Sequence, residues 1–160
     1  MTLKRYEIIN NTEGTVELLA VERFDIHYED EVDVDEILND MKECFSLDVL
    51  DNEHIYVVST NYYGVPTGII LVSVGDHKQS IVYTRTIGIF LLLIGAKKFL
   101  MLHNHPDNEI SSSNNDLISA ADVQNLANII GIDFLGSYVV GRDGWCKVGE
   151  DELCEWRDYT

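Results

Sequence analysis

The sequence predicts a single domain of the α+β class, in which strands and helices mix without a regular βαβ rhythm. The chain has 160 residues, which is enough for one substantial hydrophobic core. Its apolar content of 46% is typical of globular proteins rather than of disordered ones. Alternating and helical apolar patterns follow each other along residues 1–160 without an internal repeat or a low-complexity linker, so we expect one domain.

Residues 1–30 are predicted to form an N-terminal pair of strands, at 4–10 and 16–28. A helix is predicted at 33–45, because apolar residues recur on one face and Asp33 is a good N-cap. The residues of that apolar face are Ile37, Leu38, Met41, Cys44 and Phe45.

The middle of the sequence predicts a hairpin followed by a buried helix. Residues 54–60 are rich in β-branched and aromatic side chains, and a second strand is predicted at 67–74 after a turn at Gly64. A loop at 75–80 leads to a helix at 84–98. This helix is apolar nearly all round, so we expect it to lie in the centre of the molecule.

The last third of the sequence predicts a strand, a helix and a second hairpin. An apolar strand at 99–102 is followed, after a polar loop, by a helix at 114–130 that Gly131 ends. Strands at 133–140 and 145–148 should then pair through a tight turn rich in glycine.

The two ends of the chain and its cysteines bear on location. The acidic tail, residues 149–160, is predicted either to dock as a short segment or to be disordered. The first fourteen residues lack the apolar core of a secretory signal, and the apolar run at 87–96 is too short to span a bilayer. Cys44, Cys146 and Cys154 show no C-x-x-C spacing, which favours unpaired thiols in a reducing compartment. We therefore expect a cytoplasmic protein and no membrane partner.

The charge of the chain bears on its partners. The formal net charge is −17, from 28 acidic and 11 basic residues. Such a field repels phosphate backbones, so general binding of nucleic acid requires a local basic patch. The sequence contains only isolated basic pairs, such as those at 4–5 and 97–98. We therefore do not expect nucleic acid as a partner.

Two histidines, His103 and His105, come directly after the apolar run at 99–102. At a spacing of i, i+2 in an extended segment, both rings can project from the same side. Asp116, eleven residues after His105, can complete a set of two imidazoles and a carboxylate, which with one open position is an arrangement of catalytic zinc. Taken alone, an H-x-H pair more often marks two solvated histidines in a polar loop.

Ser113 lies at the predicted start of the helix at 114–130. As an N-cap, its hydroxyl oxygen would accept a hydrogen bond from the backbone amide of Asn115 or Asp116. This capping role is sufficient to explain a serine at the position.

The spacing H-x-H-x7-S-x2-D, formed by His103, His105, Ser113 and Asp116, resembles the signature of the JAB/MPN+ (JAMM) metalloproteases. The residues H-N-H-P and the helix that follows them are most similar to the RadC-like branch of this family. The resemblance covers residues 33–148. It implies a JAB/MPN-like α-β-α sandwich with a mixed central sheet and a zinc site at the start of a helix.

The resemblance also implies a chemistry. His103, His105 and Asp116 would bind the cofactor, Zn²⁺, and such a centre can lower the pKa of a bound water to roughly 7. A glutamate before the hairpin would act as general base; here it is Glu53, which by its residue type alone is one acid among 28. The Ser113 hydroxyl would help to stabilise an oxyanion.

Three hypotheses about function follow from the resemblance. The first is a zinc metallopeptidase or isopeptidase acting on a protein or peptide, with ubiquitin-like conjugates among the substrate classes. The second is a RadC-like accessory protein of DNA repair or mobile elements, and the third a non-catalytic MPN scaffold. The loop at 107–112 and residues 135–137 depart from the RadC-like pattern, which bears on the substrate rather than on the metal set. A homodimer is compatible with all three.

Overall fold

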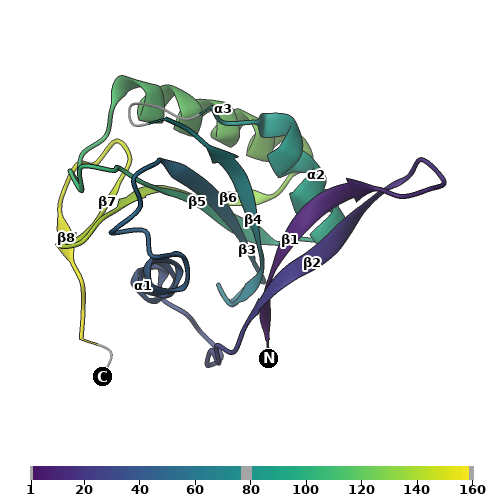
Figure 1. The fold of residues 1–160 in the computed structure, drawn as a ribbon, viewed down its shortest axis with the longest axis horizontal. Coiled ribbons are helices and arrows are strands. Elements are labelled where there is room, and N and C mark those ends of the chain that lie inside the picture. Colours follow the sequence, from purple (N-terminus) through teal and green to yellow (C-terminus); the bar gives the residue numbers. More distant parts are fainter. Residues whose placement is uncertain (1, 77–80, 159–160) are drawn as a thin grey trace.

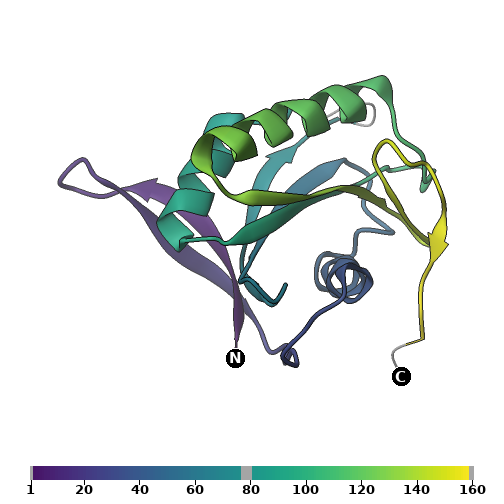
Figure 2. The same ribbon diagram turned by 180° about the vertical axis from the view of Figure 1, so that it is seen from behind.

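The computed structural model describes residues 2–76 and 81–158, in which one mixed sheet is covered by helices on both faces (Figure 1). Helix α1 lies against one face, and helices α2 and α3 lie against the other. The view from behind shows the same three layers (Figure 2). The predicted α+β class and α-β-α sandwich are confirmed.

The sheet has eight strands in the order β2-β1-β4-β3-β5-β6-β7-β8. Strand pairs β1–β4 and β5–β6 are parallel, and all the other neighbouring pairs are antiparallel. The strands are β1 (Leu3–Asn10), β2 (Val16–Phe24), β3 (His54–Thr60), β4 (Pro66–Val74), β5 (Lys98–Asn104), β6 (Asp133–Val140), β7 (Gly144–Lys147) and β8 (Cys154–Glu155).

Capping residues mark several of the helix ends. Helix α1 (Val34–Phe45) is capped by the Asp33 carboxylate, which accepts a hydrogen bond from the amide of Asp35. Helix α2 (Thr84–Ile94) and helix α3 (Asn114–Ile130) both end at a glycine in the left-handed conformation.

Each face of the sheet has its own hydrophobic core. The centre of the sheet alternates its side chains between the two faces, so that β5 sends Phe99 and Met101 toward α2 and α3 and sends Leu100 and Leu102 toward α1. All four side chains are buried. The strand that leads to the two histidines is therefore anchored on both of its faces.

Three predicted boundaries are wrong. Strand β5 extends to Asn104 rather than ending at residue 102, so it includes His103. Strand β2 ends at Phe24 rather than at residue 28, because Phe24 already pairs with Leu3, the first residue of β1, and no partner strand remains beyond it. Helix α2 ends at Ile94 rather than at residue 98. Gly95 adopts a left-handed φ of 68°, which breaks the helix, and Lys98 already belongs to β5.

The acidic tail docks on the body of the protein through residue 158. Strand β8 pairs with β7, and the Trp156 indole donates a hydrogen bond of 3.0 Å to the carbonyl of Gly141. Arg157 reaches the carboxylate of Asp33, the cap of α1, at 2.7 Å. Of the two alternatives for this segment, docking is confirmed for its described residues, and Figure 2 shows the segment descending beside α1.

Other sequence predictions concern the loop after β4, the cysteines and the membrane. Residues 77–80 of the predicted loop lie outside the described part of the chain. Cys146 is buried in β7, and the three cysteines are unpaired. Within the described ranges, no helix is long and apolar enough to cross a bilayer.

Candidate metal centre

Strands β3 and β5 place Glu53 and His103 side by side at one end of the sheet. Ile55 of β3 pairs with His103 of β5, and Glu53 comes just before the first residue of β3. Both side chains are buried, with 6% of Glu53 and 3% of His103 exposed. Two residues that lie fifty positions apart in the sequence are thereby brought to one point by the pairing of these strands.

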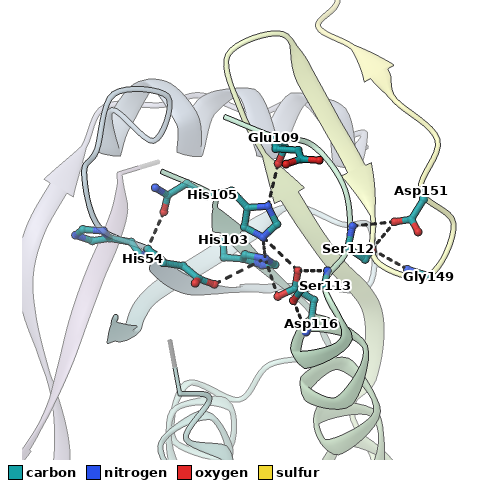
Figure 3. A network of polar contacts seen from close by, with 11 residues as sticks. His54, His103, His105, Glu109, Ser112, Ser113, Asp116, Gly149 and Asp151 are labelled. Atoms are coloured by element: carbon teal, nitrogen blue, oxygen red, sulfur yellow. Dashed lines mark hydrogen bonds and ion pairs between the residues drawn. The ribbon is translucent and has the colours of Figure 1, made fainter. Parts of the chain in front are cut away.

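His105 follows β5 and is oriented by the loop after it. Its Nδ1 lies 2.9 Å from the backbone carbonyl oxygen of Glu109 (Figure 3). Since a carbonyl only accepts hydrogen bonds, Nδ1 carries the proton and donates it. The lone pair of Nε2 in the neutral ring then faces His103 and Asp116, as a metal ligand requires.

The first turn of α3 supplies Asp116 through a reciprocal capping box. The Ser113 hydroxyl oxygen accepts a hydrogen bond of 3.1 Å from the amide of Asp116, and the Asp116 carboxylate accepts one of 2.9 Å from the amide of Ser113. Asp116 therefore has a fixed rotamer before any metal binds. The predicted capping role of Ser113 is confirmed, and its partner is Asp116 rather than Asn115.

The donor groups of three residues converge at distances that suit a single ion, with the two histidines contacting different oxygens of the Asp116 carboxylate. His103 Nε2 lies 3.1 Å from His105 Nε2 and 3.2 Å from Asp116 Oδ1, while His105 Nε2 lies 3.2 Å from Asp116 Oδ2. Ligand atoms of a tetrahedral zinc with bonds of about 2.0–2.1 Å lie about 3.3 Å apart. The spacing and the donor types therefore fit one zinc-sized cation held by these three residues.

The Glu53 carboxylate borders this set but lies farther from it. Its Oε1 is 3.9 Å from His103 Nε2, and one donor atom from each of the four residues lies within 4.8 Å of the others. This distance exceeds the separation of two ligands on one tetrahedral ion. Oε1 of Glu53 is thus set apart from the closer contacts among the other three residues.

The cluster shifts the proton affinities of its members in different directions. Burial raises the pKa of the Glu53 carboxyl; positive charge on His103 opposes this shift and the Asp116 carboxylate adds to it. Burial also acts to raise the pKa of Asp116, but hydrogen bonds from His103 and His105 outweigh it and hold that pKa far below its usual range. Burial acts to lower the pKa of His105, yet its hydrogen bonds to Asp116 and to the Glu109 carbonyl leave it raised.

A pocket of about 200 Å³ opens over the cluster. Ile55, Val82 and Met101 give it an apolar wall, and Ser113 lies on its polar side together with the ligand residues. An apolar wall beside a few converging polar groups is typical of a site that binds and orients a ligand.

The five residues singled out from the sequence therefore lie in one site: His103, His105, Asp116, Glu53 and Ser113. The other histidines lie outside this cluster where the structure describes them. His27 is exposed on its side chain, and His54 begins β3 outside the cluster. His77 lies outside the described residues.

Sequence reasoning missed two groups of residues around the site. Asn104, between the two histidines, is completely buried and bonds to the backbone on both sides of Glu53. Asp151 of the tail accepts hydrogen bonds from the amide and the hydroxyl of Ser112, the residue before the helix cap (Figure 3). The predicted strand at 99–102 stops before Asn104, whereas β5 extends to it, so the burial of this residue was not predicted.

Comparison with known proteins agrees with this geometry. A family model described as "RadC-like JAB domain" matches residues 32–153. A UPF0758 protein of Clostridium acetobutylicum is 30% identical over 103 residues, which are 64% of this chain and 45% of the relative. UPF0758 proteins of Desulfitobacterium hafniense and Staphylococcus aureus are each 28% identical over 101 residues, 63% of this chain and 44% and 46% of those relatives.

The matched stretch thus spans less than half the length of these curated relatives, and the names of these relatives state no activity. The family model, by contrast, covers most of the described sheet, both histidines and the first turn of α3. The chain belongs to the RadC-like JAB domain family.

Proposed function

We propose that this protein is a zinc-dependent hydrolase that cleaves an amide bond, either a peptide bond or the isopeptide bond of a ubiquitin-like conjugate. The observation that carries the proposal is the convergence of two imidazole nitrogens and the two oxygens of the Asp116 carboxylate, with contacts of 3.1–3.2 Å. A second carboxylate, that of Glu53, lies 3.9 Å from one of these nitrogens. Three ligands and a neighbouring base suit a hydrolytic metal site.

The donor set favours zinc among the common divalent ions. Two imidazole nitrogens and one carboxylate oxygen, contributed by His103, His105 and Asp116, are zinc ligands, whereas magnesium and calcium prefer oxygen alone. When bound, the ion would act as a Lewis acid that makes water acidic enough to ionise near neutral pH.

Glu53 is the proposed general base, and its surroundings suit that role. Its pKa is raised mainly by burial, which brings the proton affinity of the carboxylate closer to that needed near neutral pH. The carboxylate would take a proton from the attacking water and return it to the amine that leaves. The neighbouring apolar wall of the pocket keeps bulk water from competing for this carboxylate.

Ser113 is the proposed donor to the oxyanion of the transition state. Its oxygen accepts the amide hydrogen of Asp116 in the capping box, and this bond uses a lone pair rather than the hydroxyl proton. The hydroxyl proton is therefore free to be donated into the pocket that Ser113 lines. Both roles predicted for Ser113 are chemically compatible.

The proposed substrate is a polypeptide rather than a nucleic acid. The acidic residues Glu53, Asp107 and Asp116 line the pocket, and no lysine or arginine of residues 2–76 and 81–158 is among its lining residues. With the net charge of −17, this disfavours a phosphate backbone. We place the activity in the cytoplasm, where the unpaired cysteines would stay reduced.

The test of this proposal is hydrolysis with metal removal and return. Purified protein should carry about one zinc per chain and cleave a member of a panel of fluorogenic peptides and lysine-linked isopeptides. Chelation should abolish cleavage, and added zinc should restore it. Zinc-loaded protein that cleaves no peptide or isopeptide, or cleavage that survives complete chelation, would refute the proposal.

A gel-shift experiment separates the proposal from the DNA-accessory hypothesis. We expect no measurable binding to duplex DNA at physiological salt, because no basic stripe offsets the negative field. Tight binding at that salt would favour the accessory role instead.

A further inference from the structure

We propose that Asn104 is a positioning residue that sets the place of the Glu53 carboxylate relative to the metal ligands. The inference rests on the proposed function, in which Glu53 is the general base. It concerns a residue whose side chain does not line the pocket and would not touch substrate or metal.

Asn104 and His103 are neighbours on β5 and point to opposite faces of the sheet. His103 faces the pocket, whereas the Asn104 carboxamide lies on the other side and is fully buried. A buried amide must find hydrogen-bond partners, since an unsatisfied one destabilises the fold. The partners that it finds define its role.

Both partners belong to the backbone that flanks Glu53. Asn104 Oδ1 accepts a hydrogen bond of 2.7 Å from the amide of His54, and Asn104 Nδ2 donates one of 3.0 Å to the carbonyl of Asn52. One side chain thus bonds the residue before Glu53 and the residue after it. Figure 3 shows His54 and His103 at this end of the site.

The Asn104 carboxamide makes its hydrogen bonds just beyond the point where the backbone pairing of β3 with β5 ends. The last paired residues are Ile55 and His103. A carboxamide presents the same acceptor and donor as a peptide group, so the Asn104 side chain extends the ladder one step beyond this pair. This extra step holds the chain at Glu53 in line with β5.

A third bond completes the support of this segment. The amide of Gly75, just after β4, donates a hydrogen bond of 2.8 Å to the carbonyl of Glu53 itself. Glu53 is therefore held from β5 on one side and from the end of β4 on the other. Because Asn104 is the direct neighbour of His103, the same strand that carries a ligand also sets the distance from that ligand to the base.

The chemistry of the contact requires asparagine. An aspartate can accept from His54 but has no proton for the Asn52 carbonyl, which its charge would repel. A leucine has the same branched arrangement of side-chain heavy atoms but removes both bonds and leaves two backbone groups without partners. We therefore use Asn104→Leu and Asn104→Asp as graded variants.

The central experiment is a double-mutant cycle between Asn104→Leu and Glu53→Gln. Asn104→Leu alone should lower kcat by about 10–100-fold, as expected for a displaced catalytic group, with KM and zinc content little changed. In the Glu53→Gln background the same substitution should cause no further loss, because the base through which Asn104 acts is already gone. Asn104→Asp should give a loss in the same direction.

Asn108→Asp is the matched control for the aspartate arm of this cycle, because the left-handed φ of 59° at Asn108 is tolerated by aspartate but strained for leucine. Asn108 also uses its carboxamide to join two segments, bonding the Asp48 carbonyl at 3.0 Å and the Arg142 amide at 3.0 Å, but neither contact flanks Glu53. Whatever loss it causes should appear equally with and without the Glu53 carboxylate. Asn104→Leu could instead cause equal losses with Glu53 and in the Glu53→Gln background. Asn104 would then contribute only to the general stability of the fold, and the inference would be overturned.

A second readout does not depend on turnover. Hydrogen exchange of the His54 amide should be faster by at least about tenfold in Asn104→Leu, because its acceptor is removed. Unchanged exchange would overturn the inference even where no substrate is known. If Asn104→Leu does not fold, Asn104→Asp supplies the cycle, since it keeps the acceptor for His54.

The outcomes also separate this inference from the proposed function. Full turnover in Glu53→Gln would overturn both the role of Glu53 and that of Asn104. Turnover that is lost in Glu53→Gln but fully kept in Asn104→Leu would overturn the role of Asn104 alone. Loss of zinc from Asn104→Leu would mean that Asn104 supports the ligands and not the base.

Discussion

The candidate metal centre has two sides that are built differently. The strand side consists of Glu53, His103 and Asn104, which are buried and held by strand pairing and by backbone bonds. The helix side consists of His105 and the first turn of α3, where Asp116 is bonded to its own helix cap. His105 is more exposed than His103, with 18% of its side chain accessible against 4%.

The helix side depends on contacts with segments distant in the sequence. Asn108 joins the loop after His105 to Asp48 and Arg142, while Ser112 bonds Asp151 near the C-terminus. These contacts are formed by exposed or half-buried side chains, which contribute less than buried backbone bonds. The difference indicates that the strand side is held by buried bonds, whereas the loop that carries His105 depends on more exposed contacts.

The largest effect is expected where both sides lose their ligand at once. In His103→Ala with His105→Ala, only Asp116 of the three proposed ligands remains, so zinc and activity should both disappear. Elemental analysis beside a hydrolysis assay measures this. If the double variant kept all its zinc, the metal site would lie elsewhere in the protein. The comparison of the strand side with the helix side would then no longer concern a metal site.

On the strand side, Glu53→Gln should keep its zinc and lose turnover by about 10²–10⁴-fold, as for one general base. The substitution preserves the size of the side chain and removes the proton acceptor. Parallel measurements of zinc content and kcat decide the matter. Loss of zinc would make Glu53 a ligand, and full activity would direct attention to Glu109, whose carbonyl accepts from His105.

On the helix side, Ser113→Ala should keep most of its zinc and lose about 10²–10³-fold in rate if the hydroxyl supports the oxyanion. It should also lose about 1 kcal/mol of unfolding free energy, because the capping bond to the Asp116 amide is gone. A thermal melt run beside the assay separates the two effects. A lowered melting temperature with normal turnover would mean that Ser113 acts only as the cap of α3.

Metal-free protein should show a pH dependence that comes from the helix side. The raised pKa of His105 contributes stability that is fully present below about pH 6.5 and is lost as pH rises through the raised value. The lowered pKa of Asp116 contributes stability above about pH 3.9, lost only in stronger acid. The melting temperature without zinc should therefore fall as pH rises above about 6.5.

Two controls test that assignment. Asp116→Asn should flatten the slope, because it removes the partner that raises the pKa of His105. Zinc should reverse the slope, since its ligands bind best when deprotonated. A metal-free melting temperature that rises over the same pH range would contradict the assignment.

The smallest effect is expected from the contact between the helix side and the tail. Asp151→Asn keeps the shape of the side chain but weakens its acceptance of hydrogen bonds from the Ser112 amide and hydroxyl. Because the contact is exposed, kcat/KM should fall by less than about tenfold and zinc should stay bound. Comparison with the loss of activity in Asn104→Leu then shows which side of the site matters more for turnover. A larger loss from Asp151→Asn would reverse the expected order of the two sides.

Much of the architecture could be predicted from local patterns. The caps at Asp33 and Ser113 and the glycine at 131 mark helix ends, because these residues satisfy the terminal backbone groups wherever they occur. The order of His103, His105 and Asp116 along an apolar strand and a helix start was likewise sufficient to predict a metal set. These features depend on neighbours a few residues away, and local sequence describes such neighbours well.

Other features could not be predicted because they join segments far apart in the chain. Glu53 was identified through family resemblance, since nothing in its neighbourhood distinguishes it from other acids. The end of β2 at Phe24 was decided by where its partner strand begins. The docking of the tail depended on Trp156 meeting Gly141 and Arg157 meeting Asp33, which required the folded sheet.

By itself, then, the sequence of this protein determined which residues could bind a metal and on which elements they lie, because strand and helix periods orient side chains locally. Tertiary structure alone decided that Asn104 bonds the backbone on both sides of Glu53, and that Oε1 of Glu53 lies 3.9 Å from Nε2 of His103. The physical reason is the pairing of β3 with β5: its register brings together residues about fifty positions apart, and no local pattern encodes that register.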